Sequence, residues 1–389
     1  MIGRSLGFVT ATPLHVETGS GTYVGVASLG QGLTRLGWQV AFHVPRFRLV
    51  NFTLKRIIFN FLVEREVREA CHDLVVGFDL DGFHFAKTTE QNPRYVCSVK
   101  GVIADELLNE RGIVRFLLLL QSKFERLNVV RAPVVLATSR YSRERIKEAY
   151  GVPLEKIRIV PELVDLDAWK AGLHRQQEEG SRGRVILCVA HMYPRKRIDV
   201  LLRAFRTVAS FHRDVELRIV GHGQEYRRLV RLTESLALGH RVRFLGHVSQ
   251  EALFHHYKNC QIFCLPSTQE GFGIVFLEAM VAGKSIVAAH AGAVPEVVRN
   301  GVNGLLVAPR DSSQLAEALM KLLEDRDLRE HLGNVGREIV QYYGIKVVSE
   351  TFLATVGLAG ARARPGGAPI HVNASENPGT GQFGPRAEA

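Results

Sequence analysis

The chain has 389 residues, 46% of them hydrophobic, which is enough for two domains of ordinary size, each with its own core. Its formal net charge is +11 and its isoelectric point about 9.6, so we expect an anionic partner such as nucleic acid, an acidic membrane or a phosphorylated ligand. Five scattered cysteines without a CxxC pair argue against a structural zinc site and favour a reducing cytoplasm.

The apolar stretches are too short for targeting or membrane insertion. Leu6 to Val9 is shorter than the core of a secretory signal and runs on towards a glycine-rich segment. The window from Leu49 to Val63 is interrupted by Lys55 and Arg56 and is too short to cross a bilayer. We therefore expect a cytoplasmic protein without a spanning helix.

The first half of the chain alternates short β-branched runs with stretches of helical periodicity. This βαβ rhythm is typical of a parallel sheet covered by helices. The expected strands lie near SLGFVTA, QVAFHV, DLVVGF, RYVCSV and VVLATS, within residues 4–160. The glycine-rich TGSGTYV (18–24) follows the first of these strands, and Asp79 and Asp81 follow the third.

Two stretches of this half combine large apolar residues with basic ones. They read LVNFTLKRIIFNFLVER (49–65) and GIVRFLLLLQSKFER (112–126). A helix of this composition can lie in a membrane interface, so we predict association with an anionic membrane or anionic carbohydrate. The alternative is an ordinary helix that packs its apolar side in the core.

A polar segment, AGLHRQQEEGSRGR (171–184), separates this half from a second one with a cleaner βαβ rhythm. The expected strands there are VILCVA, ELRIVG, VRFLG, QIFCLPS and SIVAA. We predict an N-terminal domain at 1–170, a linker at 171–184, a C-terminal domain at 185–340, a helix at 341–358 that could return to the N-terminal domain, and a disordered tail at 359–389.

The stretch STQEGFGIVFLEA (267–279) places Glu270 and Glu278 on either side of a Gly-Phe-Gly turn. It is expected to join a strand to a helix whose first amides lack intrahelical partners, and such a helix start favours a phosphate. Gly271 and Gly273 would let a ligand approach the backbone. Ionised carboxylates accept hydrogen bonds from hydroxyls. Amides that bind phosphate beside two such carboxylates therefore indicate a nucleotide sugar as the ligand.

The segment from Pro266 to Val307, with its E-x7-E spacing, resembles the C-terminal domain of retaining GT-B glycosyltransferases of the family 4 type. VAHMYPRKRIDVLLRAF, the GHG at 221–223, VRFLGHVSQEALFHHYKN and KIRIVPELVDLDAW also match. The resemblance is dense over about residues 134–345. It implies the GT-B fold, in which two Rossmann-like doubly wound domains face each other across a cleft.

The resemblance also implies roles for individual residues. Glu270 would bind hydroxyls of the donor sugar, Glu278 the ribose and Lys196 the diphosphate. His191 stands where the family's arginine is most often found, so Arg195 or Arg197 would have to reach the phosphate instead. Donor-binding backbone is expected at these positions: Gly19, Gly21, Gly271, Phe272, Gly273 and Ile274.

The N-terminal domain departs from the family pattern at one further position. The family's histidine near the end of a middle strand has Lys100 as its counterpart, and the histidine's role does not carry over to it. The reaction implied is hexosyl transfer with retention, from a nucleotide-sugar donor to a carbohydrate or lipid-linked acceptor. It needs no cofactor, metal or nucleic acid.

Three alternatives remain open from the residues. Asp79 and Asp81 form the D-x-D pattern that holds Mn²⁺ or Mg²⁺ in metal-dependent glycosyltransferases. A nicotinamide-dependent dehydrogenase would use the same scaffold, but neither GSGTYV nor GHGQEY supplies the third glycine of its fingerprint. The altered His191 and Lys100 also fit a protein that binds nucleotide sugar without catalysis.

Overall fold

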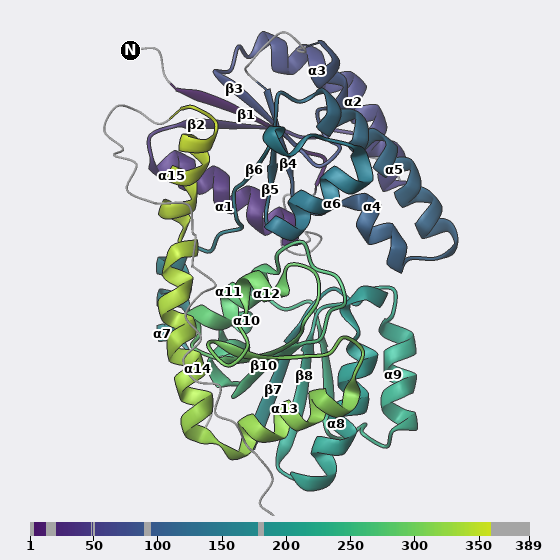
Figure 1. The fold of residues 1–389 in the computed structure, drawn as a ribbon, viewed down its shortest axis with the longest axis vertical. Coiled ribbons are helices and arrows are strands. Elements are labelled where there is room, and N and C mark those ends of the chain that lie inside the picture. Colours follow the sequence, from purple (N-terminus) through teal and green to yellow (C-terminus); the bar gives the residue numbers. More distant parts are fainter. Residues whose placement is uncertain are drawn as a thin grey trace, which may run out of the picture.

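Two parallel six-stranded sheets, each covered by helices on both faces, make up the described part of the chain (Figure 1). The structure is a computed structural model that describes residues 4–12, 21–47, 49, 51–88, 95–177 and 183–358. The predicted tail at 359–389 lies outside these residues, as does Gly19. No helix among the described residues is long and apolar enough to span a membrane.

The first sheet has the strand order β2-β1-β3-β4-β5-β6. Its strands are β1 (Ser5–Val9), β2 (Gln39–His43), β3 (Leu74–Phe78), β4 (Tyr95–Val99), β5 (Val134–Ala137) and β6 (Ile157–Ile159). Its helices are α1 (Gly21–Arg35), α2 (Phe52–Glu69), α3 (Phe83–Thr88), α4 (Ile103–Glu106), α5 (Gly112–Arg131) and α6 (Arg140–Tyr150). Separate apolar clusters on the two faces of the sheet form the core of this unit.

The second sheet has the strand order β12-β11-β10-β7-β8-β9. Its strands are β7 (Arg184–Val189), β8 (Val215–Val220), β9 (Val242–Gly246), β10 (Ile262–Leu265), β11 (Ser285–Ala289) and β12 (Gly304–Val307). Its helices include α8 (Ile198–Phe211), α9 (Tyr226–Ser235), α10 (Gln250–Asn259), α11 (Ile274–Val281) and α12 (Val294–Val297). One large apolar cluster joins them into a single core.

Helix α7 (Leu166–Arg175) lies between the two sheets in sequence and packs with the second unit. The ring centroid of Trp169 lies 4.9 Å from that of Phe254 and 5.3 Å from that of Tyr257, both on α10. Helix α7 therefore extends over the first residues of the segment predicted as a linker, and residues 178–182 of that segment are not described.

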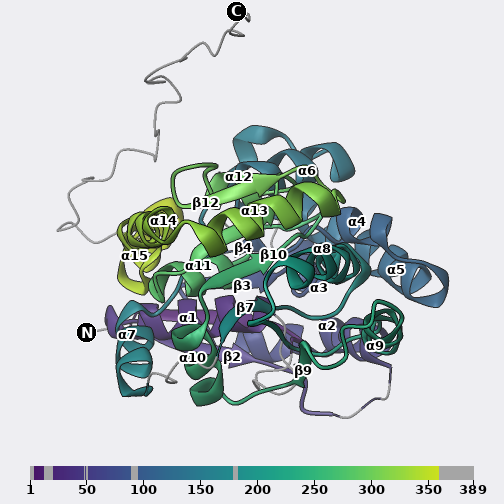
Figure 2. The same ribbon diagram turned by 90° about the horizontal axis from the view of Figure 1, so that it is seen from below.

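The chain returns to the first unit at its described end. After α13 (Ser312–Glu324) and α14 (Arg326–Ile339), helix α15 (Ile345–Thr355) contributes Ile345, Val348 and Phe352 to an apolar cluster of the first unit. Figures 1 and 2 both show α14 and α15 along one edge of the molecule, with α15 beside α1. This segment ties the two units together.

The predicted α/β class with two doubly wound sheets is confirmed. The ten strands that the sequence predicts are all present. Two further strands, β6 and β12, were not predicted, and each lies at an edge of its sheet.

Candidate functional site

The candidate site lies where the order of the second sheet reverses. The chain runs from β7 outward through β8 and β9, and then returns to place β10 on the other side of β7. The loops after β7 and β10 therefore diverge from neighbouring strand ends, which is where ligands bind in open α/β sheets. Lys196 lies in the first loop and Glu270 in the second.

Lys196 and Glu270 form an ion pair across this switch point. Lys196 Nζ lies 2.5 Å from Glu270 Oε1, and the two side chains are only 14% and 8% exposed. Burial would raise the pKa of the Glu270 carboxyl, but the Lys196 ammonium outweighs it and holds that pKa below its ordinary value. The Glu270 carboxyl is therefore charged at neutral pH and is held by the salt bridge to Lys196.

Backbone contacts hold these two loops and the loop after β11 against one another. The Thr268 amide donates to the Arg195 carbonyl over 2.8 Å, and the Ala293 amide donates to the Glu270 carbonyl over 3.0 Å. Gly292 has φ of +57°, and a Cβ there would lie 2.8 Å from backbone atoms of Glu270. Only glycine allows this close approach, so the position of Glu270 is set by its backbone.

The turn after Glu270 leads directly into α11. Gly273 precedes the helix with φ of +92°, and no side chain caps the helix start. Phe272 is buried, with its ring 5.6 Å from that of Tyr343, and Ile274 is the first helical residue. The backbone from Gly271 to Ile274 therefore borders the helix N-terminus, as the sequence predicts.

Glu278 lies one turn into α11 and is buried. Its Oε2 accepts a hydrogen bond of 2.9 Å from the hydroxyl of Tyr257 on α10. Burial raises the pKa of Glu278 to about 7, and the Tyr257 hydroxyl opposes this only in part. Near neutral pH this carboxyl is divided between its charged and neutral forms. Tyr257 itself was not predicted from the sequence.

Arg195 and His191 have other neighbours. Arg195 Nη2 lies 3.2 Å from Glu106 Oε1 on α4 of the first unit, and its guanidinium lies 4.7 Å from the Tyr193 ring. The His191 ring lies 5.8 Å from Tyr193 and 6.0 Å from His247. The loop after β7 thus holds all four basic residues named from the sequence, since Arg197 follows Lys196, and Lys196 forms the ion pair with Glu270.

Hydroxyl groups of the first unit close over the Gly271 peptide. The Gly271 carbonyl accepts hydrogen bonds of 3.1, 2.8 and 3.0 Å from the side chains of Thr138, Ser139 and Ser142. These residues follow β5 at the carboxyl edge of the first sheet. The sequence analysis missed them, although polar residues directly after a predicted strand were a signal that could have found them.

Lys100 and the two glycines of the first unit complete the predicted positions. Lys100 Nζ lies 3.1 Å from Glu162, and both side chains are buried. A Cβ on Gly271 would lie 3.1 Å from the Lys100 carbonyl, so Lys100 borders the site. Gly21 begins α1, and Gly19 is outside the described residues.

Asp79 and Asp81 belong to a buried structural network. Arg56 Nε lies 2.9 Å from Asp81 Oδ1, and Arg56 Nη2 lies 3.5 Å from Asp79 Oδ2. Their other carboxylate oxygens accept from the amides of Lys100 and Ala11. The arginine occupies the place that a cation would take between these carboxylates. Within the described ranges no cluster of three or more His, Cys, Asp or Glu could hold a metal ion.

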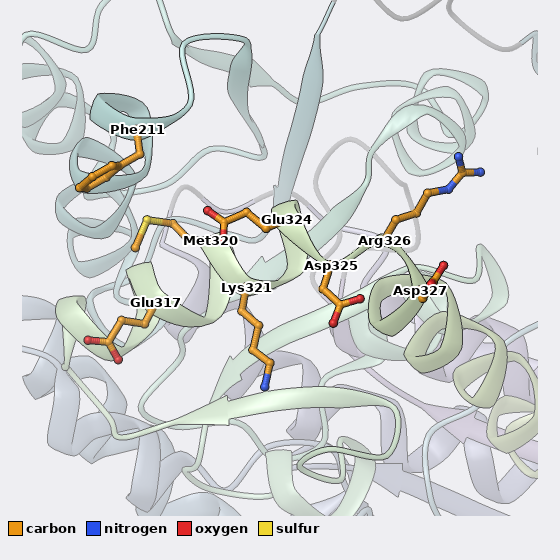
Figure 3. Close-up of a pocket in the computed structure, with 8 residues that line it drawn as sticks. All are labelled: Phe211, Glu317, Met320, Lys321, Glu324, Asp325, Arg326 and Asp327. Atoms are coloured by element: carbon orange, nitrogen blue, oxygen red, sulfur yellow. The ribbon is translucent and has the colours of Figure 1, made fainter. Parts of the chain in front are cut away.

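A broad surface hollow lies away from these loops (Figure 3). It is lined by Phe211 and by α13 and α14 residues that include Glu317, Lys321 and Asp327. Phe211 ends α8 just before β8 begins, so the hollow lies at the amino ends of the strands, opposite the switch point. Open α/β sheets bind their ligands at the other edge.

Two family models match the chain in succession. The model described as Glycosyltransferase Family 4 matches residues 19–168, and the model described as Glycosyl transferases group 1 matches residues 170–339. The first corresponds to the unit built on the first sheet and the second to the unit that carries Lys196, Glu270 and Glu278.

Curated relatives match over about half of their length. The chain is 33% identical over 220 residues to a GDP-mannose-dependent alpha-(1-6)-phosphatidylinositol monomannoside mannosyltransferase of Mycobacterium tuberculosis, covering 53% of this chain and 57% of that protein. It is 33% identical over 216 residues to a D-inositol 3-phosphate glycosyltransferase of Corynebacterium jeikeium, covering 52% of each.

Solved structures match over nearly the whole chain. Sucrose-phosphate synthase from Thermosynechococcus elongatus has a TM-score of 0.76 at 20% identity and covers 90% of this chain and 98% of its own. Anabaena HepE in complex with UDP and glucose has a TM-score of 0.70 at 20% identity and covers 91% of this chain and 99% of its own. At this identity the likeness concerns the fold.

Proposed function

Because the chain belongs to the GT-B glycosyltransferases of the family 4 type, we propose that it transfers a hexosyl group from a nucleoside diphosphate sugar to an acceptor hydroxyl. The acceptor would be a carbohydrate, a lipid-linked sugar or a small molecule. The observation that carries the proposal is the pairing of Lys196 with Glu270 at the switch point between β7 and β10. A nucleotide sugar carries a diphosphate and several hydroxyls. The cation and the helix N-terminus suit the diphosphate, and the two buried carboxylates suit the hydroxyls.

The donor would lie along α11. Glu278 would accept hydrogen bonds from the ribose, while Lys196 and the amides from Gly271 to Ile274 would face the diphosphate. Glu270 would accept from hydroxyls of the sugar. Arg195 lies on the same loop as Lys196 and is held by Glu106 of the first unit, so it would add positive charge near the diphosphate.

Donor binding would exchange partners within the ion pair. The diphosphate offers Lys196 more negative charge than Glu270 does, so the ammonium would turn towards the phosphate oxygens. Glu270 would then be released to the sugar hydroxyls, which keeps the buried carboxylate hydrogen-bonded.

The reaction would proceed with retention and without a metal or cofactor. The bond between the anomeric carbon and the diphosphate oxygen breaks, and its electron pair stays with the diphosphate, where Lys196 and the backbone amides stabilise the charge. The acceptor oxygen attacks the same face, and its proton passes to a donor phosphate oxygen. No side chain of the chain has to act as base in this scheme.

A panel of UDP- and GDP-linked hexoses tests the proposal. Thermal melting identifies the donor first, because a ligand at 100 times its dissociation constant adds about 2.7 kcal/mol to the folded state. Release of nucleoside diphosphate is then measured with and without candidate acceptors. We expect slow release alone and faster release with an acceptor, whereas a protein that neither melts later nor turns over any donor would contradict the proposal.

A non-catalytic nucleotide-sugar-binding protein is the second candidate. Two departures favour it: His191 takes the arginine's place, and Lys100 is held in a buried pair with Glu162. The same panel separates the candidates, because such a protein would be stabilised by a nucleotide sugar and yet release no diphosphate with any acceptor.

A further inference from the structure

Two neighbouring helices of the first unit bury polar side chains and expose apolar ones. Helix α2 buries Arg56 and Asn60, while Phe61 and Leu62 are exposed, the latter at 62%. It also buries the apolar side chains of Phe59, Val63 and Val67, so the inversion of this helix is partial. Helix α5 buries Gln121, Glu125 and Asn128 in the same way. Helices of a water-soluble protein ordinarily show the opposite arrangement.

The exposed apolar residues of α5 lie mainly in its first half. Ile113 is 69% exposed, Phe116 is 62% exposed and Leu119 is also exposed. The two helices are in contact, because Gln121 Nε2 donates to Thr53 Oγ1 over 2.8 Å, and Figure 1 shows both on the outer side of the first unit. We call the exposed set the α2–α5 surface; it comprises Leu54, Phe61, Leu62, Ile113, Phe116 and Leu119.

Buried polar contacts hold the helices in this orientation. Arg56 is tied to Asp81, and Asn60 donates to the same carboxylate over 3.0 Å. The Ile103 amide donates to Glu125 over 2.8 Å. Turning either helix to bury its apolar side would leave these groups without partners, which costs more than exposed apolar side chains do. The buried polar contacts therefore keep the apolar side chains of both helices exposed.

Most exposed charges beside this surface are basic, and the first acidic residue after it on α2, Glu64, is paired with Arg68 and His84. The first three turns of α2 contain Lys55 and the buried Arg56 but no acidic residue. Helix α5 carries the exposed Arg115, Lys123 and Arg126, and its one acidic residue, Glu125, is buried. A surface of large apolar groups bordered by cations complements an anionic lipid bilayer.

We propose that the α2–α5 surface docks the protein on an anionic lipid bilayer, with the apolar side chains entering the interface and the basic ones facing lipid phosphates. A second copy of the chain fits less well, because isologous pairing would bring the two sets of cations together. A soluble anionic carbohydrate would engage the cations but would leave the phenylalanines in water. Docking concerns binding alone and does not depend on glycosyl transfer.

Cosedimentation of the full chain with vesicles tests this surface. The vesicles are phosphatidylcholine alone or with about 30% phosphatidylglycerol, at about 0.05 M and about 0.5 M salt. We expect binding to the anionic vesicles that weakens at high salt. In I113Q/F116Q the affinity falls by about tenfold or more, because the apolar contact is removed. In K123Q/R126Q binding falls mainly at low salt.

Phe211→Gln is the matched control. Phe211 is 71% exposed, but it lies on α8 of the other unit, in a hollow that is also lined by Glu317, Glu324 and Asp325 (Figure 3). An anionic bilayer should be repelled there, so this variant binds vesicles like the parent. Melting curves establish that every variant is folded, as expected for substitutions at sites already in water.

Three results would overturn the proposal. The first is a parent that does not bind anionic vesicles, and the second is an I113Q/F116Q variant that binds them as well as the parent. The third is a parent that light scattering finds to be a dimer and I113Q/F116Q converts to a monomer, since the surface would then be covered by a second copy. If the parent does not bind vesicles but binds a soluble anionic polysaccharide, and I113Q/F116Q binds that polysaccharide equally well, the basic residues serve carbohydrate binding instead.

Discussion

Lys196 and Glu270 neutralise each other in a largely buried position, which makes single and double substitutions behave differently. Lys196→Met leaves a buried carboxylate unpaired, so we expect a loss of about 1–3 kcal/mol in the free energy of unfolding. Lys196→Met with Glu270→Gln should recover most of it, because no uncompensated charge remains. Urea denaturation of these two variants and of Glu270→Gln alone, at pH 7, measures the coupling. Strictly additive losses would mean that the pair is not coupled.

If Glu278 binds the ribose as proposed, nucleotide binding should depend on pH. The Glu278 pKa of about 7 means that the carboxyl is charged above and neutral below that pH, and only the charged form accepts hydrogen bonds from both ribose hydroxyls. We therefore expect the affinity for UDP or GDP to rise between pH 6 and pH 8 (roughly one unit either side of the pKa). The phosphate groups of the nucleotide also titrate in this pH range. The informative quantity is therefore the difference in affinity between the parent and Glu278→Gln at each pH. Parallel pH profiles of the two proteins would contradict the assignment.

The same carboxyl should destabilise α11 as the pH rises. Its folded pKa is raised above the ordinary value of 4.5, so between these two values the folded state holds a proton that the unfolded state has lost. The free energy of unfolding then falls as the pH rises through this window, and the loss is complete above about pH 8. Glu278→Gln keeps an acceptor for Tyr257 and should melt higher than the parent at pH 8 but not at pH 4.5. Equal melting shifts at both pH values would count against a buried, titrating Glu278.

Elements with strong local patterns were predictable, and those fixed by tertiary contacts were not. Strands such as β3 and β10 are apolar runs buried along their whole length and were found, whereas β6 and β12 are short edge strands that are only partly buried. The apolar content of α2 was visible in sequence. The orientation of α2 was not visible in sequence, because it depends on the hydrogen bonds that Asp81 accepts from Arg56 and Asn60.

The candidate site was predictable in part for the same reason. Glu270, Glu278 and the turn between them form one local strand-loop-helix unit, so the motif could be recognised directly. Lys196 is 74 residues from Glu270, and only the strand order of the sheet brings them together. Ser139, Ser142 and Tyr257 act through contacts between distant elements, which one sequence does not display.

At the scale of the whole molecule, several of the polar contacts between the two units lie at the Gly271 loop. Ser139 and Ser142 donate to the Gly271 carbonyl, and Gln269 Nε2 donates to Asp105 over 3.0 Å. If these contacts hold the loop in its donor-binding position, Ser139→Ala with Ser142→Ala should lower kcat/KM for the donor by about threefold to thirtyfold, from two neutral hydrogen bonds. Thr351→Ala, at an exposed hydroxyl of α15, is the matched control. Unchanged kinetics in the double variant would make the contacts incidental to function.

The most direct test of the central claim is calorimetric titration of UDP and GDP into the parent, Glu278→Gln and Glu270→Gln. If the nucleotide lies on Glu278 and the sugar on Glu270, Glu278→Gln weakens binding of the free nucleotide by about tenfold to a hundredfold, the cost of one charge-assisted hydrogen bond. Glu270→Gln leaves that affinity unchanged or slightly higher, since Lys196 no longer has a competing carboxylate. Both variants binding the nucleotide exactly like the parent, or both losing it equally, would contradict the arrangement of the donor along α11.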